Sequence, residues 1–413
     1  MVTRLNVELT RTVDESYPLL IGTDLADELP GVLEAAGLGR SRVAVITDST
    51  VNELIGAQVM EVLARAYREA NRAGESGAGA NGANGANEAA QSLIAQSRAP
   101  QLFVFPAGEE NKTRATKEQL EDAMLAAGFN RDTVVVALGG GVVSDLAGFV
   151  AATFTRGVPY ITMTTTLVGA ADAAIGGKTA VDTPAATNLI GAFHQPRAVL
   201  IDVARWVTLT DSQLRDGMGE TVKHACLADR NFFETLEEHF VRRGKGVREM
   251  VGDTELSGYI ARRNAEIKVE IVQSDVHEGN RRMALNLGHT IGRALEAALD
   301  YALPHGECVA IGLNLQCRLG LRYGYLTTED AERVDTLLRA IGLPTELPAG
   351  VSVADIMRTM GHDKKSLGGA IRFVFQRGIG AMETFAGGSY AREIPSAEVR
   401  EFLEAQPRQE LAS

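Results

Sequence analysis

A strand-like run of β-branched residues that ends in three glycines and passes directly into an apolar helix constrains this chain most strongly. The segment, residues 134–154, reads VVVALGGGVVSDLAGFVAATF. Glycines let a backbone approach a diphosphate closely, and amides at a helix N-terminus suit its charge. The spacing is not G-x-G-x-x-G, and strand-to-helix turns are often glycine-rich for steric reasons alone. The turn therefore predicts an α/β unit and marks a candidate nucleotide site.

Five short apolar runs rich in β-branched residues recur through the first half of the chain. Such runs, separated by helical patterns like that of residues 116–127, are typical of a mostly parallel sheet with helices on its faces. The runs are residues 42–47, 102–105, 133–138, 160–163 and 199–202. We expect an α/β fold for this half.

The pattern of the chain changes near Ala204. Beyond it lie long amphipathic segments, including residues 256–272, 288–299 and 331–341, whose apolar spacing predicts helices. We expect two domains, residues 1–204 and residues 205–413, the second of them all-helical. Within the first domain, the Gly/Ala/Asn-rich stretch 73–91 predicts a disordered surface loop.

Composition and charge argue against several classes of protein. The formal net charge of −12 disfavours a nucleic-acid partner, because a phosphate backbone requires a basic surface. The N-terminal sequence lacks the pattern of an export signal, and no apolar stretch is long enough for a membrane span. Three cysteines are too few for a disulfide framework. We expect a cytoplasmic protein without a membrane partner, and a small anionic substrate if basic side chains converge.

Asp48 directly follows the strand-like run at residues 42–47. A carboxylate in this position can accept hydrogen bonds from an adenosine ribose. The same placement suits a helix N-cap, and spacing alone does not separate the two interpretations.

Three segments of the helical half supply candidate metal ligands. They are Glu220 in DGMGETVKHA, His289 in LNLGHTIGR and His305 in LPHGECVAIG. Two neutral imidazoles and one carboxylate can form a three-ligand site for a divalent metal with open positions. Helical spacing places Asn286 and Arg293 on the same face as His289. His224, four residues after Glu220, is an alternative ligand.

Lysine and arginine residues recur beside these candidates in an otherwise acidic chain. Taken singly, each is more often a solvated surface charge. Together they would bind phosphate and carboxylate groups if the fold gathers them. They are Lys178, Lys223, Lys268, Arg282, Lys364 and Lys365.

Eight sequence blocks, in order, resemble the 3-dehydroquinate synthase family of the sugar phosphate cyclase superfamily. They are PAGEENKT, ALGGGVVSDLAGFVAATFTRG, TTTLVGAADAAIGGKTAVDTP, NLIGAFHQP, GMGETVKHA, NLGHTIG, HGECVAIG and HDKK. The resemblance implies a Rossmann-like NAD-binding domain followed by a helical domain that binds metal and substrate, with the active site between them.

The resemblance also implies roles for individual residues. The NAD contacts are Asp48, Glu109, Lys112, Gly140, Gly141, Asp145, Thr165 and Thr166. The ligands of zinc or cobalt are Glu220, His289 and His305. The catalytic residues are Lys178, Lys223, Lys268, Glu278, Arg282 and Asn286, with Glu278 helping to move protons. Further substrate contacts are Asp172, Asn188, Arg293, Lys364 and Arg156.

The activity implied by the resemblance is that of a phosphorus–oxygen lyase of the shikimate pathway. Family members convert 3-deoxy-D-arabino-heptulosonate 7-phosphate to 3-dehydroquinate and phosphate. The steps are transient oxidation by NAD, phosphate elimination, reduction and intramolecular aldol cyclisation. The resemblance assigns Arg156 to the phosphate site of a neighbouring subunit, which implies a homodimer.

This chain departs from the family pattern at a few positions. Arg293 replaces a histidine and, unlike histidine, cannot titrate near neutral pH. Thr187 replaces a lysine near NAD, and Thr164 replaces a proline. These departures leave alternatives open: a related cyclase acting on sedoheptulose 7-phosphate or an amino analogue, a metal-dependent polyol dehydrogenase, or a non-catalytic paralogue that binds NAD or a partner.

Overall fold

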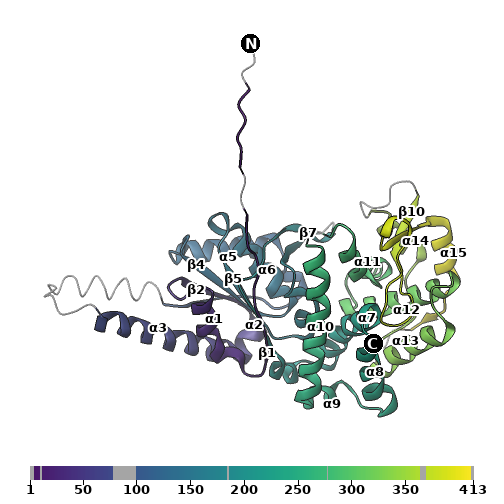
Figure 1. The fold of residues 1–413 in the computed structure, drawn as a ribbon, viewed down its shortest axis with the longest axis horizontal. Helices are drawn as coiled ribbons and strands as arrows, with labels where there is room; N and C mark the ends of the chain where they lie inside the picture. The colour runs from purple at the N-terminus through teal and green to yellow at the C-terminus, as the bar shows by residue number, and fades with distance from the viewer. Residues whose placement is uncertain are drawn as a thin grey trace.

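Six parallel strands form the central sheet of the first half (Figure 1). The computed structural model describes residues 4–9, 12–77, 99–183, 186–276, 278–362 and 369–410. In sheet order the strands are β1 (Leu19–Gly22), β8 (Val199–Asp202), β5 (Tyr160–Thr164), β4 (Thr133–Gly139), β2 (Arg42–Asp48) and β3 (Gln101–Phe105). All five predicted strands are confirmed. The edge strand β1 was not predicted; none of its four residues is fully buried, whereas all four residues of the equally short β8 are.

Helices cover both faces of this sheet, which explains why its central strands β4, β5 and β8 are buried at every position. Val134 and Val136 of β4 pack in one cluster with side chains of α1 (Leu29–Ala35) and α3 (Ala57–Gly77). Val135 and Ala137 point to the opposite face, against α5 (Arg114–Ala126) and α6 (Gly141–Thr153). The α/β fold expected for this half is confirmed.

A two-stranded antiparallel hairpin extends the first half toward the helices. It consists of β6 (Lys178–Thr183) and β7 (Ala186–Phe193), and β6 packs on α6. Gly191 faces β6 so closely that a Cβ there would collide with the Thr179 carbonyl. Lys178, the first residue of β6, lies at the end of the hairpin nearest the helical half.

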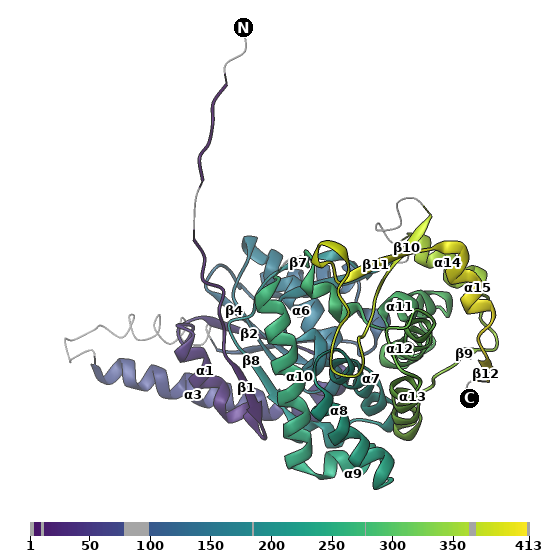
Figure 2. The ribbon, with the colours of Figure 1, turned by 45° about the vertical axis from the view of Figure 1, so that its right-hand side comes forward.

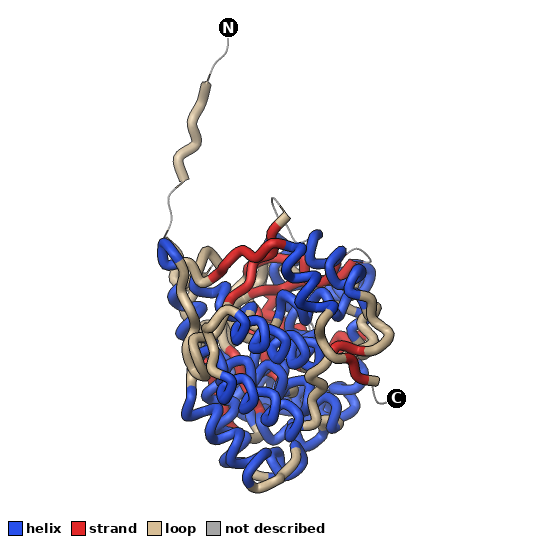
Figure 3. Tube along the Cα trace, turned by 90° about the vertical axis from the view of Figure 1, so that its right-hand side faces the viewer, coloured by secondary structure: helices blue, strands red, loops and turns tan. Residues whose placement is uncertain are grey.

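The second half is predominantly helical (Figure 3), but it is not all-helical as expected. Its main helices are α7 (Asp211–Ala228), α8 (Arg230–Glu237), α9 (Val247–Gly252), α10 (Thr254–Ser274), α11 (His289–Ala298), α12 (His305–Arg322), α13 (Thr328–Ile341), α14 (Val353–His362) and α15 (Ser396–Glu404). It also contains two short two-stranded sheets that the sequence analysis did not predict. They pair β10 (Ala370–Val374) with β11 (Ala391–Pro395), and β9 (Leu347–Pro348) with β12 (Arg408–Gln409).

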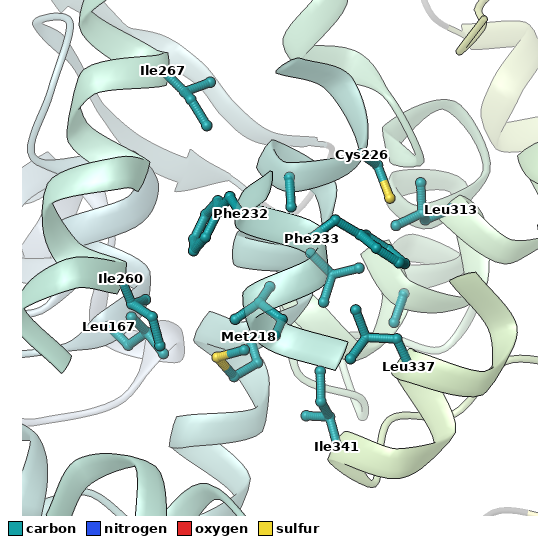
Figure 4. Packing of buried hydrophobic residues seen from close by; sticks show 14 of the residues in the cluster. Leu167, Met218, Cys226, Phe232, Phe233, Ile260, Ile267, Leu313, Leu337 and Ile341 are labelled. Carbon is teal, nitrogen blue, oxygen red and sulfur yellow. The ribbon is translucent and has the colours of Figure 1, made fainter. Parts of the chain in front are cut away.

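The largest apolar cluster crosses from one half of the chain to the other. Phe232, Phe233 and Met218 of the second half belong to it (Figure 4), as do Leu167 and Ile201 of the first half. The boundary expected near Ala204 falls within a short 3₁₀ helix, residues 203–208. The two halves therefore pack directly against each other beside the candidate site.

Helix α3 continues through Gly77 and so includes the first residues of the stretch 73–91, which were expected to be a loop. The helix formers of residues 68–73, REANRA, favour continuation of the helix into this stretch. The remainder of the stretch, residues 78–91, lies outside the described residues. Among the helices described, none is both long enough and apolar enough to cross a bilayer.

Candidate active site and metal centre

Glu220, His289 and His305 form a cluster with the composition of a metal site. Their candidate ligand atoms all lie within 4.8 Å of one another. The Glu220 Oε1 atom is 3.2 Å from the His289 Nε2 atom and 3.1 Å from the His305 Nε2 atom. Glu220 lies on α7, while the histidines begin α11 and α12. Three separate helices therefore contribute one donor each.

Glycines bring these helices together. A Cβ on Gly306 would collide with the Asp216 backbone, so the start of α12 lies directly against α7. A Cβ on Gly312 would likewise collide with the Gly288 carbonyl, where α11 begins. Side chains at these positions would separate the backbones and move the donors apart. The glycines of GMGE, NLGH and HGEC thus position the three ligands.

The second nitrogen of each histidine has a hydrogen-bond acceptor, as is typical of metal-binding imidazoles. His305 Nδ1 lies 2.9 Å from Glu296 Oε1, and His289 Nδ1 lies 3.2 Å from the Leu287 carbonyl oxygen. An Nδ1–H that donates to either acceptor leaves the Nε2 lone pair facing Glu220. Burial lowers the pKa of His289 to about 4, so its imidazole is neutral. The donor set and its orientation fit a divalent metal.

His224, the alternative ligand, does not belong to this cluster. It is buried on α7, and its Nδ1 atom lies 3.0 Å from Asn264 Oδ1 on α10. Burial lowers the pKa of His224 to about 3, which keeps the ring neutral. Its Nε2 atom has no hydrogen-bond partner among the described residues. We assign His224 to packing between α7 and α10.

Asn286 is not on the helix of His289, contrary to the expectation from spacing. Asn286 is the last residue of a 3₁₀ helix, residues 281–286. Gly288, whose backbone is left-handed with φ 76, separates that helix from α11. A left-handed residue reverses the local direction, so i, i+3 spacing no longer places side chains on one face. Asn286 nevertheless reaches the site, because its Nδ2 donates to Glu278 Oε1 at 3.0 Å.

Two lysines of the helical half are buried in ion pairs beside the metal cluster. Lys223 contacts the second carboxylate oxygen of Glu220. Lys268 on α10 lies 2.5 Å from Asp172 Oδ1 and also donates to the Asp172 carbonyl. Burial would raise the pKa of Asp172, but the ammonium of Lys268 holds it well below its usual range. Asp172 comes from the first half, so this pair joins the two halves at the site.

A second polar network lies between the hairpin and the helical half. The Lys178 Nζ atom is 2.7 Å from Glu278 Oε2, and Glu278 also accepts the hydrogen bond of Asn286. Arg282 is buried and donates to the carbonyls of Val276 and Gly176 at 2.7 and 3.2 Å. Burial is the main cause that lowers the pKa of Lys178, and Arg282 and Arg293 lower it further. The network therefore places the positive charges of Lys178 and Arg282 near the Glu278 carboxylate.

The glycine turn and Asp48 lie on neighbouring strands at the same edge of the sheet. Gly139 ends β4, and Asp48 ends β2, which pairs with β4 in parallel. The chain proceeds from β2 outward to β3 and then returns to β4, so a topological switch lies between β2 and β4. Open α/β sheets bind ligands in that place. A Cβ on Gly140 would lie 2.8 Å from the Thr166 Cγ2 atom, which explains why glycine occupies the turn.

Asp48 caps a helix in the structure, since its Oδ1 accepts from the Val51 amide at 2.8 Å. This contact occupies one carboxylate oxygen of Asp48, and the other oxygen can still accept a hydrogen bond from an adenosine ribose. Thr165 and Thr166 follow β5, the other neighbour of β4, and Thr166 Oγ1 accepts from the Gly169 amide at 3.0 Å. Thr164 is also buried, and its hydroxyl has no hydrogen-bond partner among the described residues.

Lys112, Glu109 and Asp145 form a second charged cluster beside the glycine turn. The buried Lys112 Nζ atom is 2.8 Å from Asp145 Oδ2 and 3.1 Å from Glu109 Oε1. Burial alone would lower the pKa of Lys112, but Asp145 and Glu109 raise it above its usual value. The ammonium therefore stays charged. Asp145 lies one turn into α6, so the cluster is fixed to the helix that the glycine turn begins.

Asp182 adds a titrating carboxyl to this cluster, and its effect on stability can be measured. Burial raises the pKa of Asp182 to about 6. A pKa that is higher in the folded chain stabilises folding below the unfolded value, and this contribution is lost as pH rises through the folded pKa. Replacing Asp182→Asn removes the effect. The quantity to compare is the free energy of unfolding of the wild type minus that of the variant. We expect this difference to fall by about 1 kcal/mol between pH 4 and pH 7, a value reduced because solvent partly screens the half-exposed carboxyl.

The measurement is urea unfolding of both proteins at each pH. Asp122→Asn, at an exposed position on α5, is the matched control and should give the same difference at both pH values. A wild-type minus Asp182→Asn difference that is constant with pH would contradict the raised pKa.

Several expected site residues lie outside these networks. Arg156 is exposed at the end of a 3₁₀ turn after α6, with φ 74. Asn188 is exposed on β7, and it reaches the Lys112 cluster only through its backbone amide, which donates to Asp182 at 2.8 Å. Arg293 is exposed on α11. Lys364 and Lys365 lie outside the described residues.

Two residues of the site were missed from the sequence. Glu296 follows His289 by seven residues, or two helical turns, and this spacing could have identified it as a partner for a histidine on the same side. Asp182 had no such signal, because only the hairpin brings β6 to Lys112: the Asp182 amide donates to the Lys112 carbonyl at 2.7 Å.

The sequence matches family models along most of its length. Residues 102–216 match the model described as 3-dehydroquinate synthase N-terminal, and residues 217–366 match its C-terminal counterpart. The 3-dehydroquinate synthase of Pelobacter propionicus is 40% identical over 368 residues, which cover 89% of this chain and 92% of that protein. That of Desulforamulus reducens is 37% identical over 373 residues, 90% of this chain and 94% of that protein.

Solved structures agree with this fold. A 2-epi-5-epi-valiolone synthase from Streptomyces hygroscopicus, with NAD⁺ and Zn²⁺ bound, superposes with a TM-score of 0.77 at 26% identity and covers 97% of this chain and 98% of its own. The glycine turn, the three-ligand cluster and the buried lysines thus occur in a chain that matches relatives of one family over 89% to 90% of its length. The chain belongs to the 3-dehydroquinate synthase family.

Proposed function

We propose that this chain converts 3-deoxy-D-arabino-heptulosonate 7-phosphate to 3-dehydroquinate and phosphate. The observation that carries the proposal is the cluster of Glu220, His289 and His305, with two buried lysines beside it and the glycine turn on the adjoining domain. A lyase for a phosphorylated sugar acid needs a polarised hydroxyl, a nucleotide site and cationic groups for two anions. The described residues supply groups for each task.

NAD and a divalent metal, zinc or cobalt, fit the residues present and would supply a hydride acceptor and a Lewis acid. Glu220, His289 and His305 would hold the metal. The glycine turn, Asp48 and the Lys112 cluster would hold the nucleotide. The valiolone synthase that shares this fold binds NAD⁺ and Zn²⁺, which supports the same pair of cofactors here.

The remaining residues bind and orient the substrate. Lys178, Arg282 and Asn286 supply positive charge and an amide for a phosphate or carboxylate, and Glu278 fixes two of them. Because Lys178 and Asn286 are already held in place, less ordering is needed when substrate binds. Glu278 is also the carboxylate best placed to accept and return a proton beside these groups.

The direct test is conversion of the proposed substrate by metal-loaded protein with NAD. We expect phosphate and 3-dehydroquinate to appear in equal amounts, with the product identified by mass and NMR, and a chelator to abolish both. Cyclisation of sedoheptulose 7-phosphate in place of this reaction would overturn the substrate. Reversible oxidation of a simple polyol without phosphate release would instead indicate a dehydrogenase.

Arg293→His tests the departure from the family pattern. A histidine at this exposed position would titrate near pH 6.5, whereas arginine remains charged. We expect kcat/KM of the variant to change about 2- to 10-fold between pH 6 and pH 8 relative to the parent chain, since Arg293 lies close enough to Lys178 to affect its charge. The check is a pair of pH–rate profiles, with Arg293→Gln as the non-titrating control. Identical profiles for all three proteins would exclude a role for charge at this position.

We further propose that the enzyme works as a homodimer in the cytoplasm, with Arg156 reaching the phosphate site of the neighbouring subunit. Its exposure, and its position beyond the end of α6, suit an arginine that serves another chain. Mixing inactive Arg156→Ala protein with protein inactivated at Lys268 should restore part of the activity if the arginine is shared.

A further inference from the structure

Glu278 holds two groups of the site from a strained position in the chain. Its carboxylate contacts Lys178 and Asn286, yet its backbone has φ 59, in the left-handed region that residues with a Cβ rarely adopt. Such a conformation is unfavourable by itself and persists only where neighbouring contacts hold it. The contacts of the residues around Glu278 show what holds it.

Asp275, at the end of α10, supplies the local contacts. Its Oδ1 atom accepts from the Gly279 amide at 2.7 Å, and its Oδ2 atom accepts from the amides of Asn280 and Arg282 at 2.7 and 3.0 Å. These hydrogen bonds, that of Asn280 foremost, lower the pKa of Asp275, so the carboxylate is ionised at neutral pH. Asp275 therefore fixes the backbone that follows Glu278.

The Asn280 side chain fastens the same backbone to a distant segment, residues 388–390. Its Nδ2 atom donates to the Gly388 carbonyl at 2.9 Å, and its Oδ1 atom accepts from the Tyr390 amide at 3.1 Å. A carboxamide presents a donor and an acceptor side by side, whereas an aspartate of the same shape presents no donor when ionised. In Figure 2 this segment, drawn in yellow before β11, lies beside the C-terminal end of α10.

The distant segment is itself anchored in the second half. The Phe385 amide donates to the Ser389 carbonyl at 2.8 Å, and the Phe385 ring packs edge-on against the rings of Tyr325 and Phe375, with centroids 5.6 and 6.3 Å apart. The match to the C-terminal family model ends at residue 366. The support for Glu278 therefore includes a part of the chain beyond that match.

We propose that Asn280 is a positioning residue, which fastens the backbone after Glu278 to residues 388–390 and so holds the Glu278 carboxylate against Lys178 and Asn286. The importance of this contact for the reaction rests on the proposed function, whereas the contact itself does not. A first test therefore has to read the Lys178–Glu278 contact without using the substrate.

Asn280→Asp tests the contact, because it keeps the shape of the side chain and turns the donor toward Gly388 into a second acceptor. Burial lowers the pKa of Lys178 and the Glu278 carboxylate opposes that shift, so release of Glu278 should lower the pKa further. In metal-loaded protein without substrate, acetic anhydride should then label Lys178 about 2- to 5-fold faster, the range for a half-exposed ion pair. The new negative charge alone would slow labelling, so the expected direction is diagnostic.

Three further variants complete the measurement, with labelling read by mass spectrometry. Asn280→Ala removes the donor and the acceptor without adding charge and should also speed labelling. Glu278→Gln should speed it as well, and Asn280→Asp should add no further increase in that background, because both changes act through one carboxylate. Asn231→Asp, at an exposed position on α8, makes the same change of charge and should alter nothing. Circular dichroism reports whether each variant is folded.

Activity supplies the second readout. Asn280→Asp should lower kcat/KM for the proposed substrate about 10-fold, with no further loss in the Glu278→Gln background. Unchanged labelling in Asn280→Asp or in Glu278→Gln, or effects of the two changes that simply multiply, would each overturn the proposal. Labelling that changes as expected in a parent chain that does not convert the substrate would leave Asn280 as a positioning residue and refute the proposed reaction instead.

Discussion

Glu220→Gln should remove the bound metal and lower kcat/KM by about 10³-fold or more. Glu220 supplies the anionic ligand, and a neutral amide is a much weaker donor to a divalent cation. Lewis-acid stabilisation contributes several kcal/mol in metal-assisted catalysis, and about 4 kcal/mol corresponds to 10³ in rate. The measurements are metal content of the purified variant and initial rates with added zinc or cobalt.

The loss must be separated from misfolding, because Glu220 also neutralises the buried Lys223. His305→Gln removes a second ligand that is partly exposed and leaves the buried Lys223–Glu220 pair intact, so it should lose metal while it remains folded by circular dichroism. Glu296→Gln is the graded control: it removes only the partner of His305 Nδ1, and metal affinity should fall about 10- to 100-fold. Full metal content and full activity in both ligand variants would disprove the assignment of the metal site.

Asp172→Asn should destabilise the protein by about 2 kcal/mol and reduce activity together. It leaves the Lys268 ammonium buried without its carboxylate, and removal of one partner from a buried ion pair is costly. The expected loss in the free energy of unfolding is smaller than for a fully buried ion pair, because the Asp172 side chain is 39% exposed. Urea unfolding gives the stability, and steady-state rates give kcat and KM.

The double variant Asp172→Asn with Lys268→Met distinguishes a structural role from a role in the reaction. Removing both charges should recover most of the lost stability, since no unpaired ammonium remains. Activity should not return, because the substrate then lacks the Lys268 cation. If activity recovers together with stability, the pair serves only to hold the two halves of the chain together.

The amino-acid sequence alone was enough to predict most of the secondary structure. The strands β2, β3, β4, β5 and β8 are continuous apolar runs because helices cover both sheet faces, and the long helices of the second half show clear amphipathic periodicity. Elements that bury little were missed: no residue of β1 is fully buried, and the paired strands β10 and β11 are short and partly exposed. Their apolar pattern is too brief to distinguish from loop.

Family resemblance supplied the residue types of the site, but only the tertiary structure shows which of them lie together. Spacing alone could not exclude His224 as an alternative to Glu220, and packing decided between them: His224 contacts Asn264 on α10, whereas Glu220 faces α11 and α12. Asn286 was placed on the wrong element, because a single left-handed glycine at Gly288 reversed the chain. Spacing along one segment does not report such a reversal.

The sequence by itself determined the α/β and helical halves, the glycine turn and the inventory of charged groups. These follow from local periodicity and composition, which every short window of the chain carries. Only the tertiary structure decided that Lys268 pairs with Asp172, 96 positions away, and Lys178 with Glu278, 100 positions away. Contacts of this kind depend on how whole helices pack against one another. Gly306 and Gly312 control that packing because they let two backbones approach closely. The local sequence pattern does not show which backbones will meet.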